Sequence, residues 1–246
     1  RLQHHRLRFQ EFSARSEASG RVSLFVPDRV ESEEILDEGN ASRSEMERSL
    51  RDLQRFNSLF GGTPVYRRLV KAAAKDATSV LDLGTGTSDL LGALDSSCRL
   101  RIGLDFKIDH ILYGRKLRNG PGPIHLVVAD GFHLPFLDET VDLVTSSHFF
   151  HHFSPEENQK MLQEALRVAR KAVIASDTRR HLAPLLLVRV MGLFRLIGRV
   201  TRFDGPASVL QGYTVAEARK VADGIRARRK EVRKLFPYRF GLLLWK

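Results

Sequence analysis

Five short apolar runs separated by helix-like stretches are the feature that most constrains how this chain can fold. The runs are residues 80–83, 100–104, 124–129, 141–146 and 172–176. Strands that alternate with helices form a mostly parallel sheet, and right-handed crossovers place the carboxyl ends of its strands at one edge. The pattern therefore predicts an α/β, doubly wound domain whose ligands bind at that edge.

The residues that follow these runs carry functional chemistry. Gly84-Thr85-Gly86 follows the first run, Asp105 the second, Asp130 the third, and Ser146-Ser147-His148 closes the fourth. They are far apart in the sequence, but the predicted topology brings them together at one sheet edge. We therefore expect a single site built from strand ends.

The glycine loop narrows the ligand class. A strand that runs into Gly-x-Gly lets a ligand approach the backbone closely, because no Cβ blocks the approach. A dinucleotide fingerprint would place a third glycine where Asp89 stands, and a phosphate-binding loop would need Gly-Lys-Ser/Thr after the glycines. Neither motif is present.

The run Val80-Leu81-Asp82-Leu83-Gly84-Thr85-Gly86-Thr87 resembles motif I of the class I S-adenosylmethionine-dependent methyltransferases, although Thr87 and not a further glycine follows Gly86. The resemblance extends over about residues 78–246. It implies a seven-stranded, mostly parallel, Rossmann-like sheet with a C-terminal antiparallel hairpin, N-terminal helices and a helical lid. It also implies S-adenosylmethionine as the cofactor.

In this family an acidic residue at the end of the second strand holds the ribose hydroxyls, which is the position of Asp105. Asp130, with Gly131 and Phe132, resembles the adenine-binding segment. The expected cofactor-binding residues are Asp82, Gly84, Thr85, Gly86, Asp105, Phe106, Asp130, Gly131, Phe132 and Ser147.

Each acidic residue has a purely structural alternative. Asp82 can tie down the glycine turn. Asp105 can cap a helix from Lys107 onward. Asp130 can form an Asx-turn with Gly131.

The segment after the fourth strand supplies candidates for a catalytic base. Histidine is the natural base near neutral pH, and we rank His152 first and His148 second, with His151 as a third candidate. The alternative is a histidine that packs beneath the loop. The single cysteine, Cys98, excludes a Cys-rich zinc site, and we expect no metal centre.

The chain divides into a basic and polar arm (1–43), a helical segment (44–77) and the methyltransferase-like domain (78–246). Ser44 and Glu47 predict a capping box at the start of the helical segment. The chain begins at Arg1 rather than Met, which leaves an upstream segment or a removed signal peptide open.

An insertion over residues 179–213 is the expected lid. Its stretch from Leu182 to Val200 is strongly apolar, with Arg189, Arg195 and Arg199 on one helical stripe. We expect a turn at 204–206, and residues 211–213 against the pocket. An apolar lid indicates an apolar acceptor or contact with a membrane interface; packing on the N-terminal helices or a second subunit is the alternative.

The positive charge is concentrated at the C-terminal end. The segment from Arg179 to Lys246 contains 16 Lys or Arg and 4 Asp or Glu, whereas the whole chain has a formal net charge of +11. Such a surface is compatible with a solvated basic face, an anionic membrane, an anionic substrate or RNA.

These observations lead to one preferred function and two alternatives. The preferred function is methyl transfer from S-adenosylmethionine to oxygen or carbon of a hydrophobic small molecule such as a phenol, quinone or polyketide. The alternatives are an RNA methyltransferase and a noncatalytic cofactor-binding module. No run of eighteen uncharged apolar residues is present, so we expect a cytoplasmic protein, with peripheral membrane contact through the lid as a further option.

Overall fold

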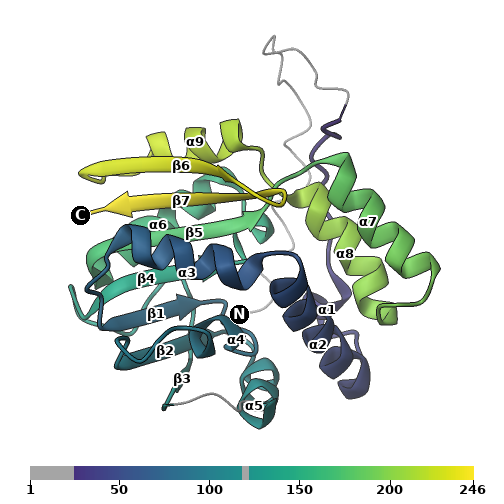
Figure 1. The fold of residues 1–246 in the computed structure, drawn as a ribbon, viewed down its shortest axis with the longest axis horizontal. Helices are drawn as coiled ribbons and strands as arrows, with labels where there is room; N and C mark the ends of the chain where they lie inside the picture. The colour runs from purple at the N-terminus through teal and green to yellow at the C-terminus, as the bar shows by residue number, and fades with distance from the viewer. Residues whose placement is uncertain (1–24, 118–121) are drawn as a thin grey trace.

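A seven-stranded sheet forms the centre of the protein (Figure 1). The computed structural model describes residues 25–117 and 122–246, so the first 24 residues of the predicted arm lie outside the described residues. The strands are β1 (Ser79–Leu83), β2 (Leu100–Asp105), β3 (His125–Val128), β4 (Val141–Ser147), β5 (Ala169–Thr178), β6 (Arg229–Leu235) and β7 (Arg239–Trp245). Their order is β3-β2-β1-β4-β5-β7-β6, and β7 runs antiparallel to both of its neighbours, β5 and β6. The predicted fold class is confirmed.

Helices cover both faces of the sheet. On one face lie α3 (Gly62–Ala73) and α4 (Asp89–Gly92), and on the other lie α6 (Pro155–Val168) and α9 (Val215–Asp223). All five residues of β1 are buried, as expected for a central parallel strand that packs on two sides. α5 (Ile108–Leu117) packs beside β2 and β3.

The strand register explains how the functional edge forms. Leu83, the last residue of β1, pairs with Leu104 of β2 and with Ser146 of β4. The residues that follow these three positions therefore emerge side by side. Ser147 of β4 pairs in turn with Ser176 of β5, which extends the edge to the end of β5.

A separate helical layer stands beyond this edge. It consists of α1 (Ile35–Glu38), α2 (Arg43–Leu59), α7 (Leu182–Leu193) and α8 (Arg199–Gln211), and both α1 and α2 pack against α8 (Figure 1). A 3₁₀ turn, η1 (Phe150–His152), connects β4 to α6 and also contacts α8. The helical layer therefore forms an outer wall opposite the sheet edge.

The start of α2 differs from the expected one. Its N-cap is Ser42, and the capping box pairs Ser42 with Glu45 rather than Ser44 with Glu47. Both pairs have the Ser-x-x-Glu spacing, so spacing alone cannot distinguish them. Arg199 of α8 also binds the Glu45 carboxylate at 2.8 Å, which favours the earlier start.

The lid also differs from the expected one. The predicted continuous stripe of arginines is broken, because α7 ends at Leu193 and Arg195 has a positive φ of 55°. The turn predicted at 204–206 is wrong, since these residues lie inside α8. Pro206 removes one helical hydrogen bond, but the Asp204 carboxylate binds the backbone N–H groups of Ile35 and Leu36 at 2.9 and 3.0 Å. These tertiary contacts outweigh the local preference for a turn.

Candidate functional site

A cavity of about 500 Å³ lies between the sheet edge and the helical layer. Its floor comes from strand ends and the loops after them, and includes Gly84, Gly86 and Asp105. Its outer wall comes from α2, α7 and α8. The predicted site residues that line it are Gly84, Gly86, Asp105, Phe106, His148 and His152.

Asp105 organises the glycine loop. Its Oδ2 accepts the N–H of Gly86 at 2.8 Å, and its Oδ1 accepts the N–H of Lys107 at 2.9 Å. The second bond is an i to i+2 Asx-turn just before α5, which begins at Ile108, so Asp105 is not the helix cap that the sequence left open. A carboxylate offers about four lone-pair sites, so Asp105 retains acceptor capacity toward the cavity.

The two glycines act in different ways. Gly84 has a φ of 65°, and a Cβ there would lie 2.6 Å from the ring of Phe149. Gly86 has a φ of 50°, and a Cβ there would meet no atom within 4 Å. Since Gly86 lines the cavity, its bare backbone leaves room for a ligand to approach.

Three predicted residues lie behind this floor. Asp82 is buried and accepts a hydrogen bond from Thr145 Oγ1 at 2.6 Å. Burial raises the pKa of Asp82 to about 7, although the bond from Thr145 opposes the rise. Thr85 is buried and donates to Ser88 Oγ, and Ser147 Oγ lies 2.8 Å from Ser176 Oγ. None of the three is among the residues that line the cavity.

The segment after β3 lies outside the cavity lining. Asp130 Oδ1 accepts the N–H of Phe132 at 2.9 Å, which is the Asx-turn that the sequence allowed. Phe132 packs edge-on against Phe153, with ring centroids 5.2 Å apart. In this structure Asp130, Gly131 and Phe132 are therefore not brought to the cavity with Asp105.

The outer wall is mostly apolar. Its apolar lining residues are Leu50, Leu53, Phe56, Phe60, Ala183, Pro184, Leu187, Val188 and Val209, and its polar ones are Ser49, Thr201, Asp204 and Ser208. The sequence placed residues 211–213 against the pocket, but Gln211 and Tyr213 are buried elsewhere, and Tyr213 donates its hydroxyl to the carbonyl of Phe153. An apolar wall opposite a polar floor suits a ligand with one hydrophobic end.

His148 is held at both ring nitrogens. Its Nε2 lies 2.6 Å from the Arg239 guanidinium, which can only donate, and its Nδ1 lies 3.5 Å from Asp177 Oδ1. Burial and the neighbouring Arg239 lower the pKa of His148 to about 3. His148 is therefore neutral near pH 7, and its Nε2 already accepts a hydrogen bond.

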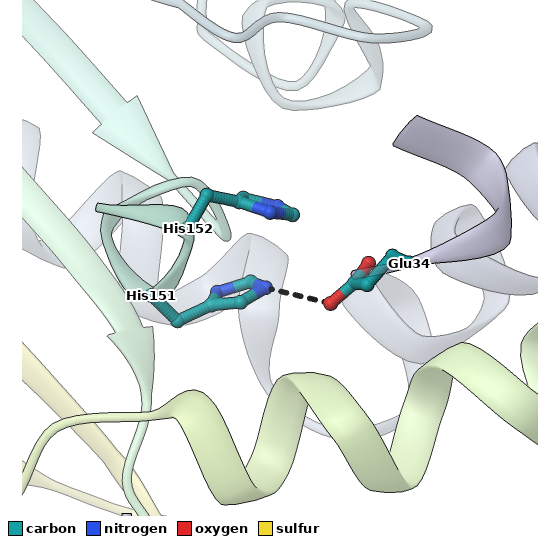
Figure 2. A group of neighbouring side chains, drawn as sticks. All are labelled: Glu34, His151 and His152. Carbon is teal, nitrogen blue, oxygen red and sulfur yellow. Dashed lines mark ion pairs between the residues drawn. The ribbon is translucent and has the colours of Figure 1, made fainter. Parts of the chain in front are cut away.

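His151 lies between two carboxylates. Its Nδ1 is 2.8 Å from Asp177 Oδ2, and its Nε2 is 3.6 Å from Glu34 Oε1 (Figure 2). Burial alone would lower the pKa of His151, but Asp177 and Glu34 outweigh it and raise that pKa to about 10. In turn His151 lowers the pKa of both carboxyl groups against the effect of burial.

His152 stacks on His151, with ring centroids 4.1 Å apart, and it faces the cavity and Glu34 (Figure 2). The sequence named His152 and His151 but assigned no role to Asp177 or Glu34. Asp177 stands near the end of the fifth strand, so the strand-end rule could have found it. Glu34 lies in a polar segment without periodicity and gave no such signal.

Comparison with known proteins supports a methyltransferase domain in the part of the chain that runs from β1 into β5. Residues 80–172 match a family model described as a methyltransferase domain. A demethylmenaquinone methyltransferase of Corynebacterium kroppenstedtii is 35% identical over 96 residues, which is 39% of this chain and 39% of that protein. The similarity thus spans about two fifths of the length of this curated relative.

Two solved structures have the same fold at low identity. One is a SAM dependent methyltransferase from Aquifex aeolicus, with a TM-score of 0.58, 19% identity and coverage of 83% of this chain and 98% of that one. The other is human N-acetylserotonin methyltransferase in complex with SAM, with a TM-score of 0.61, 14% identity and coverage of 88% of this chain and 60% of that one. At these identities the similarity concerns the fold alone.

Proposed function

We propose that this protein transfers a methyl group from S-adenosylmethionine to oxygen or carbon of a hydrophobic, aromatic small molecule, because residues 80–172 match a methyltransferase domain. One observation carries the proposal: the Gly84–Gly86 loop and Asp105 face the same cavity as the apolar wall of α2, α7 and α8. A donor and an acceptor bound there would lie in one enclosed space.

The floor of the cavity fits the donor. S-adenosylmethionine has a ribose diol, and the Asp105 carboxylate faces the cavity with acceptor capacity left after its two backbone bonds. The space beside Gly86 that a Cβ would fill is open. When bound, S-adenosylmethionine supplies an electrophilic methyl group on a sulfonium. Asp105, Gly84, Gly86 and Phe106 are the residues proposed to hold it, and Asp82 supports the loop from behind.

The outer wall supports an aromatic acceptor. The rings of Phe56 and Phe60 and the branched chains of Leu53, Leu187 and Val188 line it. The curated relative is named for a menaquinone precursor, which agrees with a quinone-like or phenolic acceptor. An RNA would need a polar, basic approach to the reacting base, so the apolar wall favours a small molecule.

His152 is the proposed base. It faces the cavity, whereas His148 Nε2 already accepts a bond from Arg239. The outer wall and α1 would make two further contributions. They would position the acceptor beside the methyl group, and they would exclude water.

The experiment is incubation with methyl-labelled donor and lipid extracts of the source organism, followed by mass spectrometry of the products. We expect labelled aromatic products, and a His152→Ala variant with much lower turnover but nearly unchanged donor affinity. Donor binding without turnover on any fraction would instead favour the noncatalytic module. Label in tRNA rather than in lipid would favour the RNA methyltransferase.

We also propose that the lid makes a peripheral contact with an anionic membrane surface. No helix among the described residues is both long and apolar enough to cross a bilayer. The α7–α8 hairpin nevertheless exposes a set of large apolar side chains, namely Leu186, Leu187, Val190, Leu193, Phe194, Leu196 and Phe203. Exposed arginines lie among them, at positions 189, 195, 199 and 202. Apolar side chains interspersed with arginines match acyl chains beneath acidic headgroups.

Leu187 belongs both to this exposed face and to the cavity lining, so an acceptor dissolved in the bilayer would have a short path to the wall. Co-sedimentation with vesicles containing phosphatidylglycerol tests the contact. We expect Leu193→Glu to reduce binding severalfold, and Leu137→Glu, at a position exposed to 84% outside the hairpin, to leave it unchanged. Equal binding to neutral vesicles, or equal loss in both variants, would contradict the contact.

A further inference from the structure

Glu34, His151 and His152 converge on one point at the inner end of the cavity (Figure 2). One ligand atom from each residue lies within 4.8 Å of the other two. Glu34 comes from the segment just before α1, and the histidines come from η1, so the fold and not a local motif brings them together. Glu34 and His151 are buried, with exposed fractions of 7% and 4%.

One buried atom of this cluster makes no hydrogen bond among the described residues. His151 Nε2 is fully buried, and among residues 25–117 and 122–246 it has no hydrogen-bond partner. Glu34 Oε1 lies 3.6 Å from it, within ion-pair distance but beyond hydrogen-bond distance. A buried polar atom of this kind calls for an explanation such as an ion or a water.

The other side of the ring is held as in a metal-bound histidine. Asp177 Oδ2 accepts from His151 Nδ1 at 2.8 Å and also binds the His151 backbone N–H at 3.1 Å. Carboxylates of this kind orient metal-ligating histidines by fixing the tautomer and the direction of the free nitrogen. Asp177 therefore directs Nε2 at the space shared with Glu34. Ser208 likewise holds Glu34 by donating to Oε1 at 2.6 Å.

We propose that Glu34, His151 and His152 bind a divalent transition-metal ion such as Zn²⁺. Ligands about 2.0–2.2 Å from a tetrahedral metal lie about 3.3–3.6 Å from one another, so the Glu34–His151 separation of 3.6 Å is at the upper end of that range. Two imidazoles and one carboxylate suit Zn²⁺ or Fe²⁺ rather than Mg²⁺ or Ca²⁺, which prefer all-oxygen sets. Three protein ligands leave an open coordination position.

That open position faces the cavity, because all three ligands line it. An ion there would bind an acceptor oxygen and favour its deprotonated form. This role rests on the proposed function, whereas binding of the ion does not. His152 would then be a metal ligand and not the base. The two roles differ in one measurable respect, because turnover would depend on added metal only if His152 is a ligand.

The test is calorimetric titration of chelator-treated protein with Zn²⁺, together with the visible absorption of the Co²⁺ complex. We expect one ion per chain with a Kd of about 10 μM or tighter. Glu34→Gln keeps the acceptor for Ser208 but removes the charge, and His152→Asn alters a half-buried ring, so both variants should fold. Each should weaken binding at least about tenfold.

The matched control is His133→Asn, at an exposed histidine that lies 3.2 Å from the Asp130 carboxylate. It should leave affinity unchanged. Absence of binding in this range, or equal binding by the Glu34 and His152 variants, would overturn the metal site and leave an ion pair between Glu34 and His151. Intact ion binding without methyl transfer to any acceptor would count against the proposed function alone.

Discussion

At the scale of single residues, the pKa values of two buried carboxyl groups near β1, those of Asp82 and Asp142, are shifted in opposite directions. Asp82 accepts a side-chain hydrogen bond from Thr145, and burial dominates and raises its pKa. Asp142 accepts the backbone N–H groups of Thr78 and Ser79 and the Thr78 hydroxyl, and these bonds outweigh burial and lower its pKa. Desolvation therefore governs one group, and hydrogen bonding to the charged form governs the other.

We predict that Asp82→Asn stabilises the unliganded protein increasingly as pH rises. The folded state holds the Asp82 proton up to a pKa of about 7, whereas the unfolded state releases it near 3.8, so native stability falls between these values. Asparagine does not titrate and removes this loss, which amounts to at most about 4 kcal/mol for three pKa units. Urea unfolding at pH 4.5 and pH 7.5 measures the difference.

Asp142→Asn is the control with the opposite sign. Its lowered pKa contributes stability that is present above its ordinary value and lost as pH falls. That variant should therefore lose nearly the same stability at pH 4.5 and pH 7.5, and a smaller amount below pH 3.8, where the wild-type contribution disappears. If both variants follow the same pH trend, the assignment of separate causes is wrong.

We predict that Asp105→Ala weakens binding of S-adenosylhomocysteine by about 1–3 kcal/mol, or about 5- to 150-fold. The variant loses the proposed acceptor for the ribose and the bond that holds Gly86. Calorimetry gives the affinity, and circular dichroism shows that the variant is folded. Asp109→Ala, at an exposed residue in the first turn of α5, should bind normally. Unchanged affinity in a folded Asp105→Ala protein would contradict the assignment.

At the scale of elements, residues 33–38, which precede α2 and include α1, lie across the cavity; we call this segment the strap. Glu34 and Leu36 line the cavity, and Asp204 of α8 holds the backbone of Ile35 and Leu36. Lys107 Nζ donates to the Leu36 carbonyl at 2.7 Å and ties the strap to the loop after β2. The strap thus connects the helical layer to the sheet edge.

We predict that Asp204→Ala increases hydrogen exchange at the amides of Ile35 and Leu36, because each loses its acceptor. Exchange measured by mass spectrometry should rise in this segment and remain the same in the sheet. Asp95→Ala removes a comparable side-chain acceptor from the Ser97 amide and serves as the control. It should affect only its own loop. Unaltered exchange over residues 33–38 would show that other contacts hold the strap.

The sequence predicted the elements that follow strict periodic rules. Parallel strands bring their ends together whatever the side chains between them, which is why Gly84, Gly86, Asp105, His148 and His152 could be placed at one edge in advance. These five line one cavity, whereas Asp130 and Ser147, placed there by the same argument, do not. The strap could not be found in this way, since Glu34 acts through His151, a residue distant in sequence. Pro206 inside α8 shows the same limit, because tertiary contacts at Asp204 override a local turn signal.

At the scale of the whole molecule, the cavity is lined both by the sheet edge and by the helical layer. A ligand that binds both layers should stabilise the folded state as a unit. We predict that S-adenosylhomocysteine at one hundred times its Kd raises the free energy of unfolding by about 2.7 kcal/mol. Thermal unfolding with and without the ligand measures the shift. Asp105→Ala should show a smaller shift at the same concentration, and an equal shift would place the ligand elsewhere.

The floor and the outer wall of the cavity come from different parts of the fold, which has a consequence for engineering and for evolution. The proposed donor side belongs to loops between strands, whereas the proposed acceptor side belongs to α2, α7 and α8, which the sheet does not need for its own hydrogen bonding. Chimeras that exchange only residues 43–60 and 182–211 with those of a relative would therefore transplant acceptor choice onto an unchanged donor platform. Specificity in such a protein is modular, and new chemistry can arise by recombination of its outer helices.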